Sequence, residues 1–389
     1  MSKRIKGFLF FLCFSLSCTL IAPCASAQAL EVPSPPDLSA QSAILIEAES
    51  GVSILEKNAS TRLPMASTTK IMTALVALES ASPDTVITVP ACAVGIEGSS
   101  IYLVEGEQLT LEELLYALLL ESANDAAIAI AIGVCGSVEQ FCERMNQKAL
   151  RLGLQDTHFT NPHGLDDAEH YTTAEDLAQI ARAALRNELI ANIVATRKTT
   201  IPHAGEDGVR LLVNHNKLLR LCEDCIGVKT GYTSQSGRCL VSAAERNGVT
   251  VIAVTLNAPN DWNDHQAMFE YGFSSYARTQ LCAEGEFRIP IPVVGGKDSY
   301  VLACNKQALS ATLPTNHSIK VVYLHRTFEY SPICEGESLG RVSFFSDVNG
   351  DGKEEEVGSA ILYASYSIEP RKQKKSLWQW IRSLFGAKS

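Results

Sequence analysis

Apolar and polar residues alternate in two regions of the chain that lie far apart. Residues 42–60 read SAILIEAESGVSILEKNAS, two alternating runs around a turn at 49–51, and this pattern predicts a β-hairpin. Much later, CIGVKTGYT (225–233), CLVSAAE (239–245) and VTVIAVTLN (249–257) are separated by segments rich in Ser, Gly and Asn. These runs predict three consecutive antiparallel strands.

Between the two strand regions, apolar residues recur at helical spacing. Thr110 and Glu113 form a capping box ahead of LLYALLL, a helix that breaks near Ser122. Thr172 and Glu175 have the same spacing ahead of EDLAQIARAAL. Helices are expected from about residue 67, in 114–120, from 125 onward, in 175–185 and in 263–277. Strands on both sides of a helical block indicate an α/β (α+β) domain over residues 41–277, whose sheet joins its two ends.

Residues 278–368 show short alternating runs and no helical period. Strands are expected in 286–294, 299–304, 319–325, 340–346 and 359–368, which predicts a small β-rich domain. The segment DVNGDGKEEE partly fits a calcium loop, with Asp347, Asn349 and Asp351 in register. Its twelfth position is Gly358, where calcium needs a bidentate Glu. An ordinary Asn-Gly/Asp-Gly hairpin turn is therefore the preferred interpretation.

The N-terminal residues have the pattern of a secretory signal peptide. Three basic residues precede an apolar run over 8–21, and Ala25-Ser26-Ala27 gives a small-x-small cleavage site. Residues 1–27 are therefore expected to be removed, and the alternative is an uncleaved membrane anchor. The Pro/Ser-rich residues 28–40 are expected to form a linker.

The C-terminal residues 369–389 form a third unit. A basic cluster at 371–375 precedes Leu377, Trp378, Ile381, Leu384 and Phe385, which share one helical face. Aromatic residues and neighbouring cations suit a helix that lies on the surface of an anionic membrane. The alternative is a helix that packs back on the protein.

Composition narrows the range of functions. Apolar residues make up 46% of the 389 residues, which is ordinary for a globular protein, and the net charge of −10 argues against a nucleic-acid partner. Loss of the signal peptide would reduce the 12 cysteines to nine, at scattered positions. A buried structural or disulfide role for Cys222 and Cys225 is preferred over a redox role, and a Cys225–Cys239 disulfide is a further possibility.

Ser67 and Lys70 stand one helical turn apart at the start of an apolar helix. Positions i and i+3 share a helix face, so the amine can reach the hydroxyl. A serine needs a base to become a nucleophile, and a lysine can be that base if burial and a second cation lower its pKa. The spacing alone is common, and on its own a plain surface helix turn would normally be the better explanation.

Two other segments make the catalytic interpretation stronger. Ser122 and Asn124 lie at a helix break, where their side chains can point into a cleft. Lys229-Thr230-Gly231 lies on a predicted strand. The glycine allows a substrate to approach the strand closely, and the cation and hydroxyl suit a carboxylate. Ser-x-x-Lys, Ser-x-Asn and Lys-Thr-Gly, in this order, form the signature of penicillin-binding proteins and class A β-lactamases.

The sequence resembles the low-molecular-mass penicillin-binding proteins that act as serine-type D-alanyl-D-alanine carboxypeptidases. The likeness covers most of residues 40–277 and includes LPMASTTKIMTAL, LLLESANDAA, FTNPHGLDD…HYTTAEDLA, NHNKLL, GVKTGYT and EYGF. It implies a transpeptidase-like fold with an antiparallel sheet and a helical block. It also implies a β-rich domain and an amphipathic tail on the outer face of the bacterial cytoplasmic membrane.

The same resemblance implies the roles of the site residues. Ser67 would attack the carbonyl between the two terminal D-alanines of a peptidoglycan stem peptide, Lys70 would take its proton, and Ser122 would pass a proton towards the leaving amine. β-Lactams, which imitate this dipeptide, would acylate the same serine. No metal or other cofactor is expected.

The remaining residues of the three motifs would bind the substrate. Asn124 would orient its amide, and Lys229 and Thr230 would hold its carboxylate beside Gly231. Backbone N–H groups of Ser67 and Tyr232 would form the oxyanion hole.

Some positions depart from the family pattern. Tyr232 replaces a His found in several relatives, and His215 precedes Asn216 where many relatives carry a basic or small residue. Both departures concern substrate preference. His163 and His170 are expected to be structural, because Ser67 already has a lysine.

Three alternatives remain at this point. A class A-like β-lactamase would need a Glu for deacylation, for which Glu169 is the candidate. A D,D-endopeptidase would use the same residues. A non-catalytic wall-binding protein would not need three intact motifs.

Overall fold

The computed structural model describes residues 34–203, 208–348 and 350–372. The expected signal peptide and amphipathic helix lie outside these residues. Among the described residues, no single helix is long and apolar enough to cross a membrane. The helices at Asn124–Cys135 and Val138–Arg151 pass that test only as a pair bent by 87°.

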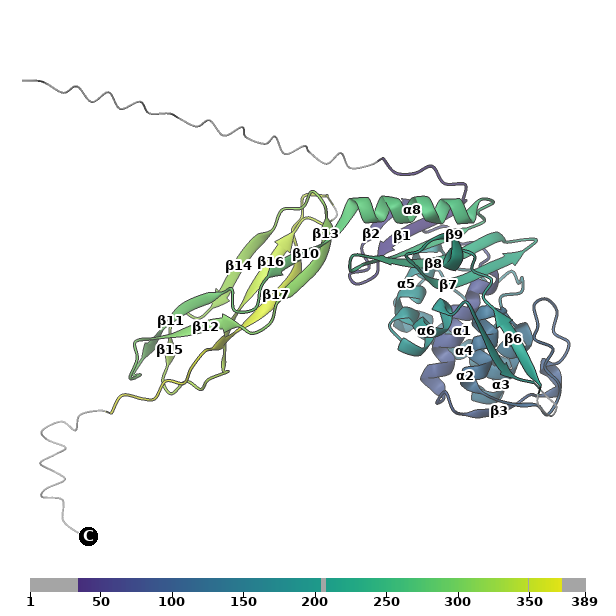
Figure 1. Ribbon diagram of the computed structural model, residues 1–389, viewed down its shortest axis with the longest axis horizontal. Coiled ribbons are helices and arrows are strands. Elements are labelled where there is room, and N and C mark those ends of the chain that lie inside the picture. Colours follow the sequence, from purple (N-terminus) through teal and green to yellow (C-terminus); the bar gives the residue numbers. More distant parts are fainter. Residues whose placement is uncertain (1–33, 204–207, 349, 373–389) are drawn as a thin grey trace, which may run out of the picture. The chain divides into compact units, whose positions relative to one another are not determined.

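A five-stranded antiparallel sheet forms the centre of the N-terminal domain (Figure 1). Its strands stand in the order β2-β1-β9-β8-β7. Their bounds are β1 Ser42–Glu47, β2 Ser53–Lys57, β7 Cys225–Thr233, β8 Gly237–Arg246 and β9 Val249–Leu256. Ser42 of β1 stands opposite Leu256 of β9. The structure thus confirms the predicted hairpin, the three later strands and the sheet that joins the two ends of the domain.

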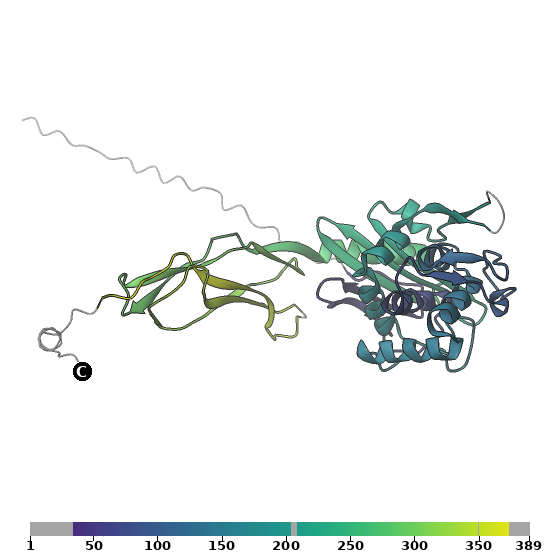
Figure 2. The same ribbon diagram turned by 90° about the horizontal axis from the view of Figure 1, so that it is seen from below.

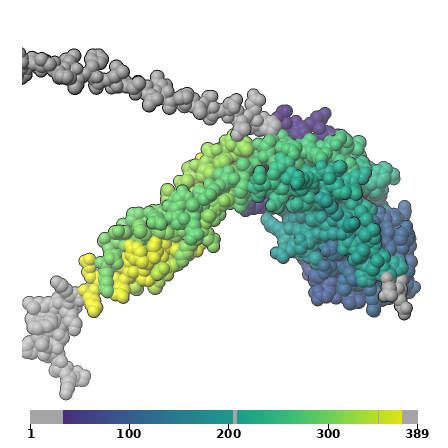
Figure 3. Space-filling model, in the orientation of Figure 1, coloured from purple at the N-terminus to yellow at the C-terminus, as the bar shows by residue number. Residues whose placement is uncertain are grey.

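Helices cover both faces of this sheet (Figure 1). Alternating residues of β1 supply both interfaces: Ile44 and Ile46 join the core beneath the helical block, and Ala43 and Leu45 join the core beneath α8, Asp261–Ser275. Because successive strand residues face opposite sides of a sheet, one short apolar strand can serve two cores. Figure 3 shows that segments from different parts of the sequence contribute to the surface of this domain.

The face of the sheet opposite α8 carries the helical block, whose helices lie between β2 and β7 in the sequence. It consists of η1 Ala66–Thr69, α1 Lys70–Ser80, α2 Leu111–Leu120, α3 Asn124–Cys135, α4 Val138–Arg151, α5 Ala174–Leu185 and α6 Glu188–Ala195. A short helix, α7 Leu218–Leu221, precedes β7. Small two-stranded ribbons join β3 Val86–Thr88 to β4 Gln108–Thr110 and β5 Lys198–Pro202 to β6 Val209–Val213. A 3₁₀ turn, η2, spans Ala91–Ala93.

One of the two predicted helix caps is shifted. The capping box of Thr110 and Glu113 is present in full at α2. At α5 the N-cap is Thr173, whose hydroxyl accepts a hydrogen bond from the Asp176 N–H at 3.0 Å, and the expected cap, Thr172, is one residue off. The Thr172 hydroxyl instead lies 2.7 Å from the Thr157 hydroxyl in the interior.

The end of the expected linker is fixed against the domain. Leu38 and Ala40 are buried, and the Ser39 hydroxyl donates a 2.8 Å hydrogen bond to the Asp264 carboxylate. The backbone N–H of Ala40 donates to the same carboxylate at 3.1 Å. These residues have no regular secondary structure, but α8 holds them in place just before β1 begins.

The C-terminal domain consists of strands, as predicted (Figure 2). It has its own hydrophobic core. Its strands are β10 Tyr276–Cys282, β11 Arg288–Val294, β12 Tyr300–Asn305, β13 Leu309–Pro314, β14 Lys320–His325, β15 Glu329–Tyr330, β16 Ser338–Ser346 and β17 Glu355–Ala364. Strands β10, β13 and β15 were not predicted. Strand β10 follows α8 without a turn, so its apolar residues extended the helical pattern to residue 277 in the sequence.

The suggested Cys225–Cys239 disulfide is wrong for this structure, in which both thiols are free. The register of the β7–β8 hairpin explains why. Cys225 stands opposite Ala244 and Cys239 stands opposite Gly231, so the two thiols are several residues apart along the ribbon. Because a strand rises about 3.3 Å per residue, the distance between the two cysteines along the ribbon is greater than a disulfide can bridge.

Candidate active site

Ser67 lies in the 3₁₀ turn η1, immediately before α1. The residue before it, Ala66, has a left-handed backbone (φ +47°). Gly164 packs against this turn with φ +90°, and a Cβ at position 164 would lie 1.9 Å from the carbonyl oxygen of Ala66. Only glycine fits there, so the loop that contains Gly164 sets the position of the serine turn.

The Lys70 amine is directed at Ser67 and is wholly buried. Its Nζ lies 3.0 Å from Ser67 Oγ, 2.7 Å from Asn124 Oδ1 and 2.5 Å from the carbonyl oxygen of His163. The orientation of the Asn124 amide is defined by its other end, because Nδ2 donates to the carbonyl of Glu97 at 2.6 Å. Two of the three atoms that contact the Lys70 Nζ, Asn124 Oδ1 and the carbonyl oxygen of His163, can thus only accept hydrogen bonds.

These contacts match a neutral amine. A neutral lysine has two hydrogens and one lone pair; the hydrogens can go to the oxygens of Asn124 and His163, which leaves the lone pair for the Ser67 hydroxyl. Burial, followed by repulsion from the charge on Lys229, holds the pKa of Lys70 well below its usual range. The lowered pKa therefore favours a Lys70 that can accept a proton from Ser67, and its contacts allow that state.

Ser122 and Asn124 lie where α2 ends and α3 begins. Ser122 has a left-handed backbone (φ +61°) and lines the cleft beside Ser67. The backbone N–H of Asn124 donates to the carbonyl of Ser99 at 2.7 Å. The helix break predicted from the sequence is thus held by the loop around Ser99.

Lys229, Thr230 and Gly231 lie on β7, the edge strand of the sheet, which runs beside the serine turn. A Cβ at Gly231 would lie 3.1 Å from the backbone nitrogen of Ser67, so the strand and the turn are in close contact. The Lys229 amine is buried and donates to the carbonyl of Thr230 at 2.9 Å. Burial lowers the pKa of Lys229 to about 7, and the opposite charge of Glu121 acts against that shift.

The three motifs therefore meet at one cleft of about 350 Å³. Ser67, Ser122, Thr230, Gly231 and Tyr232 line it. Lys70, Asn124 and Lys229 lie behind this lining, almost without exposure. The side chain of Asn124 is already bonded at both ends, to Lys70 and Glu97.

Sequence reasoning missed one end of the cleft. Arg238, Asp261 and Trp262 also line it. The buried carboxylate of Asp261 accepts from Arg238 Nε at 3.0 Å and Nη2 at 2.8 Å, and the guanidinium lies 5.4 Å from the Trp262 ring centroid. Arg238 stands opposite Tyr232 across the hairpin. Pairing the residues on either side of the turn in GYTSQSGR would therefore have placed Arg238 at the cleft, beside Tyr232.

His163 and His170 were expected to have structural roles, and their surroundings agree with this. Burial lowers the pKa of His163 to about 3 and that of His170 to about 4, so both are neutral. His170 Nε2 lies 2.8 Å from the Thr69 hydroxyl and supports the serine turn. His215, noted as a departure from the family, does line the cleft, where Nε2 lies 3.1 Å from a Glu121 carboxylate oxygen. Glu169 is exposed and is not among the described residues that line this cleft.

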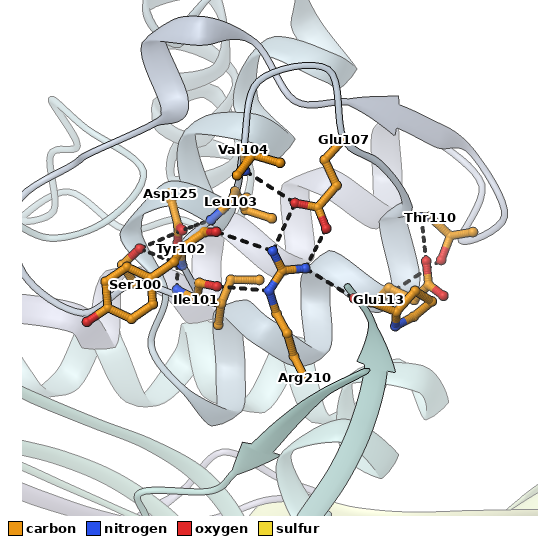
Figure 4. Close-up of polar contacts among 11 residues, drawn as sticks. Ser100, Ile101, Tyr102, Leu103, Val104, Glu107, Thr110, Glu113, Asp125 and Arg210 are labelled. Atoms are coloured by element: carbon orange, nitrogen blue, oxygen red, sulfur yellow. Dashed lines mark hydrogen bonds and ion pairs between the residues drawn. The ribbon is translucent and has the colours of Figure 1, made fainter. Parts of the chain in front are cut away.

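A buried network holds the loop that borders the cleft (Figure 4). Arg210 on β6 donates to the carbonyls of Ile101 at 2.9 Å and Tyr102 at 3.3 Å, and forms a two-pronged ion pair with Glu107 at 2.5 and 2.9 Å. From the other side, the Asp125 carboxylate accepts the Leu103 N–H at 3.0 Å and the Ser100 hydroxyl at 2.6 Å. A cation thus binds the carbonyls of this loop, and an anion binds its amide groups.

Comparisons with known proteins point to one family. The family model described as D-alanyl-D-alanine carboxypeptidase matches residues 29–260. The chain is 32% identical to the D-alanyl-D-alanine carboxypeptidase DacF of Bacillus subtilis over 319 residues, 79% of this chain and 82% of that protein. It is 30% identical to the D-alanyl-D-alanine carboxypeptidase DacC of Escherichia coli over 357 residues, 86% of each chain.

Solved structures give the same result. Penicillin binding protein 5 from Haemophilus influenzae has a TM-score of 0.67 at 26% identity, and the match covers 87% of this chain and 99% of that one. A peptidoglycan synthesis regulatory factor from Streptococcus pneumoniae has a TM-score of 0.70 at 26% identity, with 86% of this chain and 100% of that one covered.

Arg210→Met should destabilise the protein strongly. It would leave the Glu107 carboxylate buried without its guanidinium, and breaking a buried pair from one side costs about 3–5 kcal/mol. Urea denaturation measures the loss. Arg62→Met, which breaks an ion pair with Asp156 whose side chains are 53% and 45% exposed, is the matched control and should cost at most about 1 kcal/mol. Equal losses in the two variants would contradict the structural importance of the Arg210 network.

Proposed function

The chain belongs to the D-alanyl-D-alanine carboxypeptidase family and is a serine-type carboxypeptidase, and we propose that Ser67 carries its acyl-enzyme. The observation that supports this assignment most directly is the 3.0 Å approach of the buried Lys70 Nζ to Ser67 Oγ. A neutral amine at this position is the base that a serine nucleophile needs.

In the proposed reaction, the Ser67 oxygen attacks the carbonyl between the two terminal D-alanines of a stem peptide, and its proton passes to Lys70. Backbone N–H groups of Ser67 and Tyr232 stabilise the oxyanion. The C–N bond breaks when the leaving amine receives a proton by way of Ser122. D-Alanine departs, and water hydrolyses the ester to regenerate Ser67.

The free carboxylate of the substrate is the feature that the cleft recognises. Lys229 and Thr230 are assigned to it, and Arg238 adds a second cation from the neighbouring strand. A guanidinium can bind a carboxylate with two parallel hydrogen bonds, and the buried Asp261 holds Arg238 at the cleft. Asn124 is assigned to orient the substrate amide, with its oxygen also positioning Lys70.

β-Lactams carry a carboxylate near a reactive amide and are expected to acylate the same serine. The β-lactamase alternative needs a carboxylate that activates the deacylating water, and Glu169 is exposed rather than positioned for this task. The acyl group left by a β-lactam should therefore be hydrolysed slowly.

We also propose that the protein is exported and held on the outer face of the bacterial cytoplasmic membrane. Support comes from the sequence alone, namely the signal-peptide pattern of residues 1–27 and the amphipathic, basic residues 371–389. A stem-peptide substrate outside the cytoplasm fits this location.

Ser67→Ala should abolish labelling by a fluorescent penicillin and lower the release of D-alanine from a diacetyl-Lys-D-Ala-D-Ala peptide by at least about a thousandfold, as expected when a nucleophile is removed. Ser99→Ala is the matched control, because Ser99 lines the same cleft but has no assigned chemical role. Persistent labelling of Ser67→Ala would assign the nucleophile elsewhere.

Lys229→Met should shift the pH dependence of acylation. The charge on Lys229 lowers the pKa of Lys70, so its removal should raise that pKa and move the acid limb of kcat/KM to higher pH, at a lower maximal rate. The alkaline limb, which we assign to deprotonation of Lys229 with a pKa of about 7, should disappear. Lys217→Met changes an exposed cation of the cleft and should leave the acid limb in place. An unchanged acid limb in Lys229→Met would refute the coupling of the two amines.

Deletion of residues 371–389 should release the protein from vesicles that contain phosphatidylglycerol, while hydrolysis of the diacetyl-Lys-D-Ala-D-Ala peptide stays unchanged. Co-sedimentation measures the binding. A full-length variant with Leu384→Lys and Phe385→Lys keeps the length and adds positive charge, so it separates loss of the apolar face from loss of charge. Continued sedimentation of the deletion variant would disprove the anchor.

A further inference from the structure

The β5–β6 ribbon exposes an apolar face beside the cleft. Val209, Leu211 and Val213 are 70%, 62% and 38% exposed. Across the ribbon they stand opposite Pro202, Thr200 and Lys198, which are exposed as well. Residues directly opposite each other share a face of a two-stranded ribbon, so these six residues form one surface, called here the ribbon face.

The opposite face of the ribbon is firmly anchored. Ile201 and Leu212 are buried, and Arg210 reaches into the network with Glu107, Ile101 and Tyr102 (Figure 4). The described strands of this ribbon therefore stay in place, and the ribbon face remains turned outward. Tyr102, whose carbonyl Arg210 binds, is itself 82% exposed. Exposed apolar residues that cluster in this way mark interaction sites.

The ribbon face leads directly into the cleft. Alternate residues from Val209 onward are exposed, and the two that follow Val213 in this series are His215 and Lys217, which line the cleft. The intervening residues, including Asn214 and Asn216, are buried. One stretch of chain thus carries an apolar surface at one end and the lining of the active site at the other.

We propose that the ribbon face binds the peptidoglycan strand that carries the reacting peptide. This inference rests on the proposed function. The cleft, at about 350 Å³, is at the small end of the range for ligand pockets, so a polymer that enters it must extend over the adjoining surface. The alanine methyl groups and sugar C–H faces of peptidoglycan match the aliphatic residues Val209, Leu211 and Val213. Lys198 and Lys217, at the margin of this surface, suit its carboxylates.

Continuity with the cleft favours this occupant over a protein partner or a second copy of the chain. A partner protein could dock on the ribbon face without effect on catalysis. A substrate strand cannot, because its peptide must reach Ser67 at the same time. The ribbon face should therefore influence the rate on polymeric substrate and have no influence on a dipeptide-sized one.

The test compares Leu211→Thr and the double variant Val209→Thr/Leu211→Thr with the parent enzyme. Threonine has the β-branched shape that strands favour and removes apolar surface from side chains that are already exposed. Leu150→Thr on α4, at a leucine that is 71% exposed, is the matched control. Each protein is assayed for D-alanine release from the diacetyl-Lys-D-Ala-D-Ala peptide, from a soluble disaccharide pentapeptide and from uncrosslinked polymeric peptidoglycan.

We expect the double variant to lose about three- to tenfold in kcat/KM on the polymer and to keep the parent rate on the short peptide, with Leu150→Thr unchanged on both. A loss on the disaccharide pentapeptide as well would place the contact within one repeating unit, and a loss on the polymer alone would place it beyond that unit. Equal losses on short and polymeric substrates, or no loss on either, would overturn the proposal. A change in oligomeric state without a change on the polymer would overturn it in favour of a second copy. If the parent enzyme released no D-alanine from the short peptide, the proposed function itself would fail.

Discussion

The burial of two lysine amines at one site is the constraint on which the rest of the active site depends. In water both would carry a proton. Placed together in the interior, each loses hydration, and each charge disfavours the other. Burial and the charge of Lys229 hold the pKa of Lys70 well below its usual range, which makes Lys70 the neutral member of the pair, and its contacts with two acceptor oxygens and one hydroxyl are compatible with that state. Lys229, near the opposite charge of Glu121, is the member that better retains its proton.

Segments from distant parts of the chain must pack around the serine turn and the two amines to keep them buried. The serine turn lies between β7 and the Gly164 loop, and both approach it so closely that no side chain fits at Gly164 and little space remains at Gly231. Asn124 connects the Lys70 amine to the loop around Glu97 and Ser99. The sheet and the helical block supply rigidity, because their packed cores leave the catalytic elements little freedom to shift.

The sequence predicted those features of the fold and the site that depend on the type and spacing of side chains. Alternation found the central strands, and the three motifs found the part of the cleft lining that includes Ser67, Ser122 and Thr230. Two equivalent spacings, Thr172 with Glu175 and Thr173 with Asp176, could each cap α5, and only the tertiary contact of Thr172 with Thr157 decided between them. The carbonyls of His163 and Glu97 were invisible to sequence reasoning, because a backbone oxygen has no residue-type signal.

The β6 strand shows how an ion pair can override the usual polarity of a strand. By alternation alone, VRLLV would bury Val209, Leu211 and Val213 and expose Arg210. The structure does the reverse, since the ion pair with Glu107 and the carbonyls of the neighbouring loop satisfy the guanidinium inside. A shift by one residue would exchange the two faces, so the Arg210 contacts set which face meets water. A local rule broken in this way, next to a catalytic cleft, is what a functional surface would require.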